Sequence, residues 1–336
     1  MVGQVHLHPS AFILHPSSFP SCLSPPAFRL HPSSFILHFV SQANSQLKER
    51  VRAFWQENPC GTKFADAEPG SRRFYELVEQ HRYEKEWHIP EAANFAGTAG
   101  KRVLEIGCGL GTDGAQFAKA GADYTGCDLT EAAVELARKR FALSNLKGTF
   151  CTADAEKLDF PDNTFDVVYS HGVLHHTPDT AGAVREVHRV LKTGGRAIVM
   201  LYHRDSYNYR INIRLLRRGG MHLLKWHSGR VLIHKMTGEP LDSLQQHAEK
   251  LRAKTNGHLD PDEFLSQNTD GAGNPLARVY SRREARELFK DFANVQFRAY
   301  FLNKRFIPIV GNFLPRSFES ALATRWGWHL WIYATK

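Results

Sequence analysis

Acidic side chains flank a glycine-rich turn near residue 107, and these residues carry the most specific chemistry in the sequence. Residues 105–111 read Glu-Ile-Gly-Cys-Gly-Leu-Gly, so a carboxylate enters the loop just before three alternating glycines. Residues 109–114 also spell the G-x-G-x-x-G of dinucleotide-binding folds. A carboxylate beside a pyrophosphate would cost several kcal/mol in a partly dry site, whereas it would attract a ligand that carries an ammonium and a sulfonium. Glu105 therefore favours a cationic cofactor, and we interpret the match that ends at Gly114 as a coincidence of register.

S-adenosylmethionine is a cofactor of that kind. The three glycines lack a Cβ, so the backbone can approach its methionine and ribose closely. A helix that begins near Thr112 offers its N-terminus to the carboxylate of the cofactor. Asp128 ends the next predicted strand, where it can accept both ribose hydroxyls, but NAD enzymes use the same device. Glu105, and not Asp128, discriminates between the two cofactors.

The elements that must position these residues alternate between strands and helices. Apolar segments predict strands at 102–106, 122–127, 148–153, 165–170 and 196–202, and helices are predicted at 112–120, 130–143 and 178–191. Regular alternation with short links predicts an α/β fold: a Rossmann-like, doubly wound, mostly parallel sheet with helices on both faces. Right-handed crossovers then bring every βα loop to one edge of the sheet, where ligands bind.

Four further regions surround this core, which spans residues 101–202. Residues 1–44 contain a proline-rich repeat, for example HPSSFILH at 31–38, and we expect a disordered low-complexity tail. Residues 45–100 predict an N-terminal helical segment, with Val51 and Trp55 on one helix face and Ser71 as the N-cap of a second helix. Residues 203–280 predict a basic helical lid or substrate region, and residues 281–336 predict the C-terminal part of the fold, with strands at 294–302 and 329–335.

Four motifs in the core resemble the successive motifs of class I S-adenosylmethionine-dependent methyltransferases. They read VLEIGCGLG, GCDLT, CTADAEKLDFPDNTFDVVYSHGVLHH and REVHRVLKTGGRAIVM, in the order and spacing of that family. They are most similar to the group typified by small-molecule and quinone-biosynthesis enzymes. The resemblance implies S-adenosylmethionine as the cofactor and methyl transfer to a small-molecule acceptor at oxygen, nitrogen or carbon.

The resemblance also implies a role for each matching residue of the cofactor site. Nine positions would contact or shape it: Glu105 and Gly107 at the methionine, Gly109 and Gly111 in the turn, Asp128 at the ribose diol, Leu129 on the adenine ring, Asp154 and Ala155 at the adenine edge, and Ser170 beneath the methionine. His171 ends the same strand as Ser170 and would lie near the methyl donor.

Histidines 171, 175 and 176 are the candidate proton acceptors. The unperturbed pKa of histidine suits proton abstraction near neutral pH, so His171 and His175 are the catalytic candidates. His175 and His176 precede a helix near Pro178 and could instead cap it or bond to the backbone. A base is needed for a hydroxyl or an acidic C–H acceptor and is dispensable for an amine. Adjacent histidines project differently and no third ligand stands at zinc spacing, so the sequence predicts no metal site.

Charge bears on the acceptor without identifying it. The net charge is +9, and residues 203–254 hold eleven Lys or Arg against four Asp or Glu. This stretch is compatible with a solvated basic face, with arginine recognition of an anionic acceptor, or with contact to anionic lipid beside a membrane-borne acceptor. Residues 170–173 read Ser-His-Gly-Val where nucleic-acid base methyltransferases carry an Asn/Asp-Pro-Pro-aromatic motif, which speaks against a nucleic-acid substrate.

Composition and cysteine usage suggest a location. No run of 18 apolar residues predicts a transmembrane helix, and the five scattered cysteines make a reducing, cytoplasmic setting the default, with peripheral membrane contact left open by the basic stretch. Two alternatives to an active methyltransferase remain: a non-catalytic S-adenosylmethionine-binding protein and, less strongly, an NAD-dependent oxidoreductase. The sequence indicates neither the identity of the acceptor nor an oligomeric state.

Overall fold

The computed structural model describes residues 32–217, 220, 223–238, 240–253, 261–271, 273–302 and 315–336. The chain divides into two units, residues 1–41 and 42–336, and the fold below is that of the second unit. Most of the predicted tail, up to residue 31, lies outside the described residues. Helix α1 (Pro32–Glu57) begins before the predicted residue 45, so the predicted boundary at residue 44 falls inside a helix.

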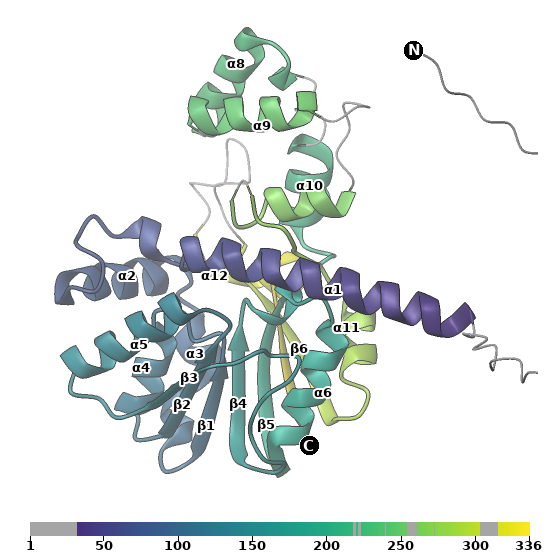
Figure 1. The fold of residues 1–336 in the computed structure, drawn as a ribbon. Coiled ribbons are helices and arrows are strands. Elements are labelled where there is room, and N and C mark those ends of the chain that lie inside the picture. Colours follow the sequence, from purple (N-terminus) through teal and green to yellow (C-terminus); the bar gives the residue numbers. More distant parts are fainter. Residues whose placement is uncertain are drawn as a thin grey trace, which may run out of the picture. The chain divides into compact units, whose positions relative to one another are not determined.

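Seven strands form one sheet in the order β3-β2-β1-β4-β5-β7-β6 (Figure 1). Their bounds are β1 (Arg102–Ile106), β2 (Asp123–Asp128), β3 (Thr149–Thr152), β4 (Phe165–His171), β5 (Leu191–Tyr202), β6 (Ala293–Tyr300) and β7 (His329–Thr335). Strands β1 to β5 pair in parallel, whereas β7 runs antiparallel to both of its neighbours. The predicted α/β, doubly wound and mostly parallel sheet is confirmed, and all seven predicted strands are present with some shifts at their ends.

The central strands are apolar on both faces because helices cover the sheet from both sides. In β4, Val167 and Tyr169 belong to one buried cluster and Val168 to the other. The first cluster includes side chains of α3 (Ile89–Ala93), α4 (Thr112–Lys119) and α5 (Glu131–Leu143), and the second those of α6 (Thr180–Val190) and α11 (Arg282–Leu288). Figure 1 shows these helices beside the strands of the sheet. Burial on both faces explains why these strands read as continuous apolar runs.

Side-chain caps fix the start of several helices. Ser71 accepts a hydrogen bond from the Phe74 amide at 3.1 Å at the start of α2 (Arg72–Lys85), which confirms the predicted N-cap. Ser281 and Glu284 form a reciprocal capping box at the start of α11. Thr130 makes no capping bond at α5, and its hydroxyl instead donates to the Asp128 carboxylate at 2.9 Å. That bond ties the start of α5 to the end of β2.

Helices fill the region between β5 and α11. They are the π-helix η4 (Asn208–Arg217) and helices α8 (His227–Thr237), α9 (Leu241–Ala253) and α10 (Pro261–Gln267). Four apolar side chains of this region form a small core of their own: Leu224, Ile233, Leu244 and Ala248. After β6, helix α12 (Arg316–Trp326) leads into β7. In the described part of the chain, no helix is both long and apolar enough to cross a membrane.

Candidate functional site

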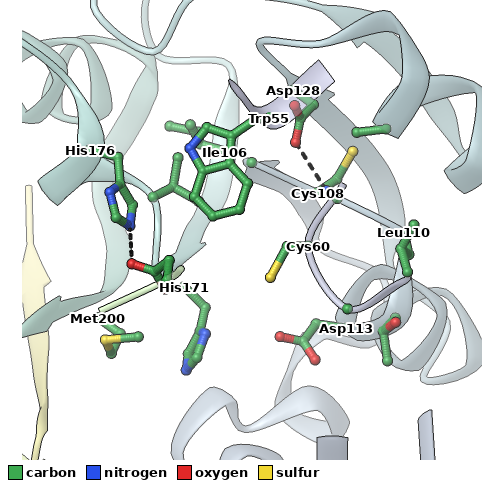
Figure 2. A pocket seen from close by; sticks show the side chains of 18 of the residues that line it. Trp55, Cys60, Ile106, Cys108, Leu110, Asp113, Asp128, His171, His176 and Met200 are labelled. Atoms are coloured by element: carbon green, nitrogen blue, oxygen red, sulfur yellow. Dashed lines mark hydrogen bonds and ion pairs between the residues drawn. The ribbon is translucent and has the colours of Figure 1, made fainter. Parts of the chain in front are cut away.

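A cavity of about 860 Å³ opens at the carboxyl edge of the sheet, where β1 and β4 lie side by side and the strand order reverses. The residues that end β1, β2, β4 and β5 line it: Ile106, Asp128, His171 and Tyr202. Trp55 of α1 and His176 of the short 3-10 helix η3 (Leu174–His176) face the same space (Figure 2). The edge predicted to bind ligands is therefore the edge that holds the cavity.

The loop after β1 needs glycine at defined positions. Gly107 has a φ of 76°, and a Cβ there would lie 2.1 Å from a Val173 methyl group, so a larger residue would clash. Gly109 has a φ of 50° and open space around its Cα, and its N–H donates to Asp128 at 3.1 Å. Gly111, with a φ of 69°, stands at the N-cap of α4 and packs against α5. Gly107 and Gly109 line the cavity, whereas Gly111 shapes the turn.

Gly114 also has a structural role, so the interpretation of its match as a coincidence was wrong. A Cβ at this position of α4 would lie 2.3 Å from the Tyr124 Oη and 2.9 Å from Oε2 of Glu105. Helix α4 can therefore pack closely on β1 and β2, which is the role of the third glycine in dinucleotide-binding loops. Both glycine patterns describe one strand–loop–helix unit, and the cofactor must be inferred from the acidic residues around it.

Glu105 lies on β1 at the wall of the cavity and is only 4% exposed. Its Oε2 accepts a hydrogen bond from the Tyr124 Oη at 2.5 Å. Burial, together with the nearby charge of Asp113, raises the pKa of Glu105 well above its usual range, and the bond from Tyr124 opposes this rise only in part. A cation in the cavity would stabilise the ionised carboxylate. The predicted contact with the cofactor ammonium stays a prediction that this environment favours.

Arg82 and Asp113 form a buried ion pair that the sequence analysis missed. Arg82 of α2 donates from Nε to Oδ1 of Asp113 at 2.8 Å and from Nη2 to Oδ2 at 2.5 Å. Tyr83 and Tyr169 donate to the same carboxylate at 3.0 and 2.8 Å. Burial alone would raise the pKa of Asp113, but the Arg82 charge and these hydrogen bonds lower it. No local pattern signals the pair, because its partners lie on separate helices that only the fold brings together.

Asp128 holds the loop that surrounds it. Its Oδ1 accepts from the backbone and hydroxyl of Thr130 at 3.0 and 2.9 Å, while Oδ2 accepts from Gly109. Burial raises the pKa of Asp128, and the backbone bonds partly oppose that rise. Leu129 lines the cavity beside it. The ribose contact predicted for Asp128 and the adenine contact predicted for Leu129 stay predictions, and both residues lie where such contacts can form.

Asp154 is joined to helix α1. Lys48 of α1 places its Nζ 2.5 Å from Oδ2 of Asp154 and 2.5 Å from a Glu156 oxygen. Oδ1 of Asp154 accepts from the Glu156 amide at 2.9 Å. Ala155 lines the cavity between these two acidic residues. The predicted adenine edge is therefore bridged by a lysine from the N-terminal helix, and the adenine contacts of Asp154 and Ala155 stay predictions.

Ser170 and His175 are fully buried and do not line the cavity. The Ser170 hydroxyl donates to the Ile106 carbonyl at 3.0 Å, which ties β4 to β1. The His175 ring lies against Tyr202, with 3.8 Å between ring centroids, and burial lowers its pKa well below the usual range. The roles predicted for these two residues stay predictions, and each would need a rearrangement to reach a ligand in the cavity.

His171 lines the cavity at the end of β4. Its Nδ1 lies 3.2 Å from Nη2 of Arg82, and since a guanidinium can only donate, Nδ1 is the acceptor and the proton of the neutral ring is on Nε2. Burial and the Arg82 charge lower the pKa of His171 well below its usual range. The lone pair that a base would use is engaged, so the predicted catalytic role of His171 requires Arg82 to move.

Asp270 adds a carboxylate to the cavity that the sequence analysis did not single out. The Tyr202 hydroxyl donates to its Oδ1 at 2.7 Å, and Nε2 of His176 lies 3.4 Å from Oδ2. Nδ1 of His176 donates to the Leu276 carbonyl at 2.5 Å, and Trp55 meets the histidine ring edge-on at 5.5 Å between centroids. Asp270 lies far along the chain from β5, so only the fold shows that it belongs to the site.

Helix α1 covers the cavity with Lys48, Val51 and Trp55, and α2 contributes a further set of lining side chains. Of the described residues between 203 and 280, only Asp270 lines the cavity. The N-terminal segment therefore contributes more of the cover than the sequence led us to expect. The lid role of residues 203–280 stays a prediction.

Comparison with known proteins agrees with the motif analysis. Residues 104–199 match a family model described as a methyltransferase domain. The ubiquinone biosynthesis O-methyltransferase of Aromatoleum aromaticum is 32% identical over 187 residues, which cover 55% of this chain and 74% of that protein. The ubiquinone biosynthesis O-methyltransferase of Pseudomonas aeruginosa is 37% identical over 116 residues, 34% of this chain and 50% of that protein.

A third relative acts on another compound. The 27-O-demethylrifamycin SV methyltransferase of Amycolatopsis mediterranei is 41% identical over 101 residues, 29% of this chain and 37% of that protein. The chain thus spans about half the length of curated relatives such as the Pseudomonas protein. The family-model match begins in β1 and ends in β5, so Arg82, Asp270 and the cover from α1 lie outside it.

Proposed function

The chain belongs to the class I S-adenosylmethionine-dependent methyltransferase family, and we propose that it transfers a methyl group from S-adenosylmethionine to a small-molecule acceptor. The observation that carries the proposal is the placement of Glu105 and Asp128 on neighbouring strands that border one cavity. Glu105 suits the ammonium of the cofactor and Asp128 suits its ribose diol. The cavity of about 860 Å³ lies within the range of ligand pockets, roughly 300–1,000 Å³.

S-adenosylmethionine, when bound, supplies a methyl carbon that its sulfonium has already activated. The chain's own task is to align the acceptor with that carbon and to exclude water. Trp55, Met200 and Phe301 provide apolar surface in the cavity for the second purpose. The adenine end of the ligand belongs with Leu129 and Ala155 in this proposal, and the methionine end with Glu105.

Asp270 is the proton acceptor in this proposal when the acceptor is a hydroxyl. It lines the cavity, its Oδ1 is oriented by Tyr202, and its Oδ2 faces the His176 ring. A carboxylate held by hydrogen bonds from Tyr202 and Asn274 can receive a proton without first breaking an ion pair with arginine or lysine. His171 lacks that advantage because Arg82 engages its lone pair, and His175 lacks access to the cavity.

The acceptor class follows from the relatives only as a proposal. Two of them carry the name of ubiquinone biosynthesis and one that of a rifamycin, so we favour an oxygen acceptor on an extended aromatic or quinone-like ring. Such an acceptor could reside in a membrane, where the basic residues between 203 and 254 would contact anionic lipid. An anionic acceptor, a cytoplasmic location and peripheral membrane contact stay predictions.

Methyl-labelled S-adenosylmethionine incubated with the protein and cell extract tests the proposal. Transfer of label to a small molecule is the expected result, and the labelled product identifies the acceptor. With that acceptor, Asp270→Asn should lower turnover while S-adenosylmethionine affinity is kept. Cofactor binding with no labelled product would favour the non-catalytic alternative, and NADH binding without S-adenosylmethionine binding would overturn the proposal.

A further inference from the structure

Three histidines from distant parts of the sequence converge at one side of the cavity. His88 precedes α3, His171 ends β4 and His329 begins β7. One ring nitrogen from each lies within 4.8 Å of the others. Nδ1 of His329 and Nε2 of His88 are 3.4 Å apart. Two nitrogens on a tetrahedral zinc ion, each about 2.1 Å from the metal, would be separated by about 3.4 Å.

The ring nitrogens of the cluster differ in how readily they can bind a metal. Nε2 of His171 is buried and has no hydrogen-bond partner among the residues that the structure describes. It carries the ring proton while Arg82 donates to Nδ1, so a metal at Nε2 requires that proton to move to Nδ1 and Arg82 to turn towards its carboxylates. Nε2 of His329 faces Oε1 of Glu86 at 3.7 Å, which favours a proton on that nitrogen and leaves Nδ1 free to bind a metal. A carboxylate behind a ligating histidine is the usual arrangement around protein-bound metals.

The surrounding charges also leave room for a cation. Arg82 is the cation beside the cluster, 3.2 Å from Nδ1 of His171, and it faces two carboxylates, Asp113 and Glu86. With both carboxylates ionised, this group carries one surplus negative charge. A divalent ion would therefore enter a site that is net negative and rich in nitrogen ligands.

One side of the cluster is open to the cavity. His171, His329 and Glu86 line it, while His88 is 1% exposed and stacks on Tyr300 behind them. Three protein ligands with a free position facing a ligand cavity is the pattern of a catalytic metal site and not of a closed structural one. An oxygen of a bound acceptor, or a water, can take the free position.

We propose that His88, His171 and His329 form a binding site for a divalent transition-metal ion, with Glu86 as the supporting carboxylate. Imidazole ligands select zinc, iron, nickel or copper over magnesium and calcium. The role of the ion rests on the proposed methyl transfer: it would hold the acceptor oxygen and favour its ionisation, with the released proton passing to a base or to water. The rival arrangement is a metal-free hydrogen-bonded chain from Glu86 through His329 to His88.

Titration of chelator-treated full-length protein with Co²⁺ and Zn²⁺ tests the site directly. The visible absorption spectrum of Co²⁺ should show that one equivalent binds through nitrogen ligands. Added Zn²⁺ should displace that equivalent. The N-terminal histidines can bind further metal ions, so the total amount bound does not decide the question. The decisive measurement is whether His88→Gln and His329→Gln each bind one equivalent of Co²⁺ less than wild type. Loss of the supporting carboxylate in Glu86→Gln should weaken this equivalent by about 10–100-fold. His203→Gln is the matched control, because His203 is buried but lies outside the cluster.

X-ray absorption of zinc-loaded wild-type protein gives an answer that does not depend on how well the variants fold. Imidazole scattering from several ligands at one equivalent supports the site. A sulfur shell, which Cys60 in the lining of the same cavity could supply, overturns it. Equal Co²⁺ binding in wild type, His88→Gln and His329→Gln also overturns it and favours the metal-free chain. S-adenosylmethionine affinity, measured in parallel, should survive in His329→Gln, which separates failure of the metal site from failure of the proposed function.

Discussion

Arg82 on α2 donates hydrogen bonds to both carboxylate oxygens of Asp113 at the start of α4, with N···O distances of 2.8 and 2.5 Å. The Asp113 side chain is 2% exposed and the Arg82 side chain is 24% exposed, so the carboxylate of this bidentate pair is shielded from water. It fastens the N-terminal helical segment to the first helix of the core, directly beside the glycine loop. The position of Arg82 also fixes Nδ1 as the acceptor nitrogen of His171. Arg82 thus links the N-terminal helical segment both to α4 and to His171 at the end of β4.

Removing one partner of this pair should destabilise the protein. In Arg82→Met the Asp113 carboxylate stays buried with only two tyrosine hydroxyls as partners, and we expect a loss of about 3–5 kcal/mol in the free energy of unfolding. Chemical denaturation measures it. The double variant Arg82→Met, Asp113→Leu should recover part of the loss, because no buried charge remains. An Arg82→Met protein as stable as wild type would show that the pair is unimportant.

Asp128 should contribute directly to cofactor affinity. Asp128→Ala removes a charged acceptor from the predicted ribose diol, and we expect S-adenosylmethionine binding to weaken by roughly 1–3 kcal/mol. Calorimetric titration measures the change. Asp159→Ala removes an exposed carboxylate outside the cavity and is the matched control. Because Asp128 also holds Gly109 and Thr130, the melting temperature of each variant should be recorded, and unchanged affinity in a folded Asp128→Ala protein would refute the ribose contact.

Glu105 should make cofactor binding depend on pH. Burial raises its pKa, so the ligand-free carboxyl keeps its proton to a higher pH than in the unfolded chain. The folded state then binds more protons, and the stability of the ligand-free protein should fall as pH rises between the unfolded and folded pKa values. The ammonium of the cofactor needs the ionised carboxylate, so affinity should rise with pH over the same interval.

Proton release on cofactor binding tests whether the affinity rises with pH. Calorimetric titration of wild type in buffers with different ionisation enthalpies should show that S-adenosylmethionine binding releases a proton. Glu105→Gln has the same shape without the titrating group, and both the proton release and the rise in affinity with pH should disappear. Persistence of the release in Glu105→Gln would assign it to another residue.

Lys48 should slow the departure of the cofactor. Its amine bridges Asp154 and Glu156 from α1 at the predicted adenine end of the cavity, with the lysine side chain 20% exposed. Lys48→Met breaks a partly buried ion pair, and we expect S-adenosylmethionine to dissociate several-fold faster, equivalent to roughly 1–2 kcal/mol. Stopped-flow displacement measures the rate. Arg50→Met, on the exposed side of the same helix, should leave the rate unchanged; equal rates in both variants would show that α1 does not retain the ligand.

The sequence by itself determined the sheet and the edge at which the cavity lies. Apolar runs such as 102–106 and 165–170 specify buried parallel strands, because helices must cover both faces of such a sheet. Gly107 and Asp128 were found from local spacing, since a strand–loop–helix unit is compact enough to be read from consecutive residues. Family resemblance extended this reading to Asp154, for which it implies a contact with adenine.

Only the tertiary structure decided which charges are paired and which residues complete the site. Arg82 meets Asp113, Asp270 meets Tyr202, and the histidine cluster joins β4 to β7, across separations that no local pattern records. Burial then set the protonation that sequence spacing could not: Glu105 is a hydrogen-bonded group with a raised pKa, not a free carboxylate, because it is enclosed beside Tyr124. Local propensity fixes elements, but desolvation and long-range contacts fix the chemistry of the side chains those elements carry.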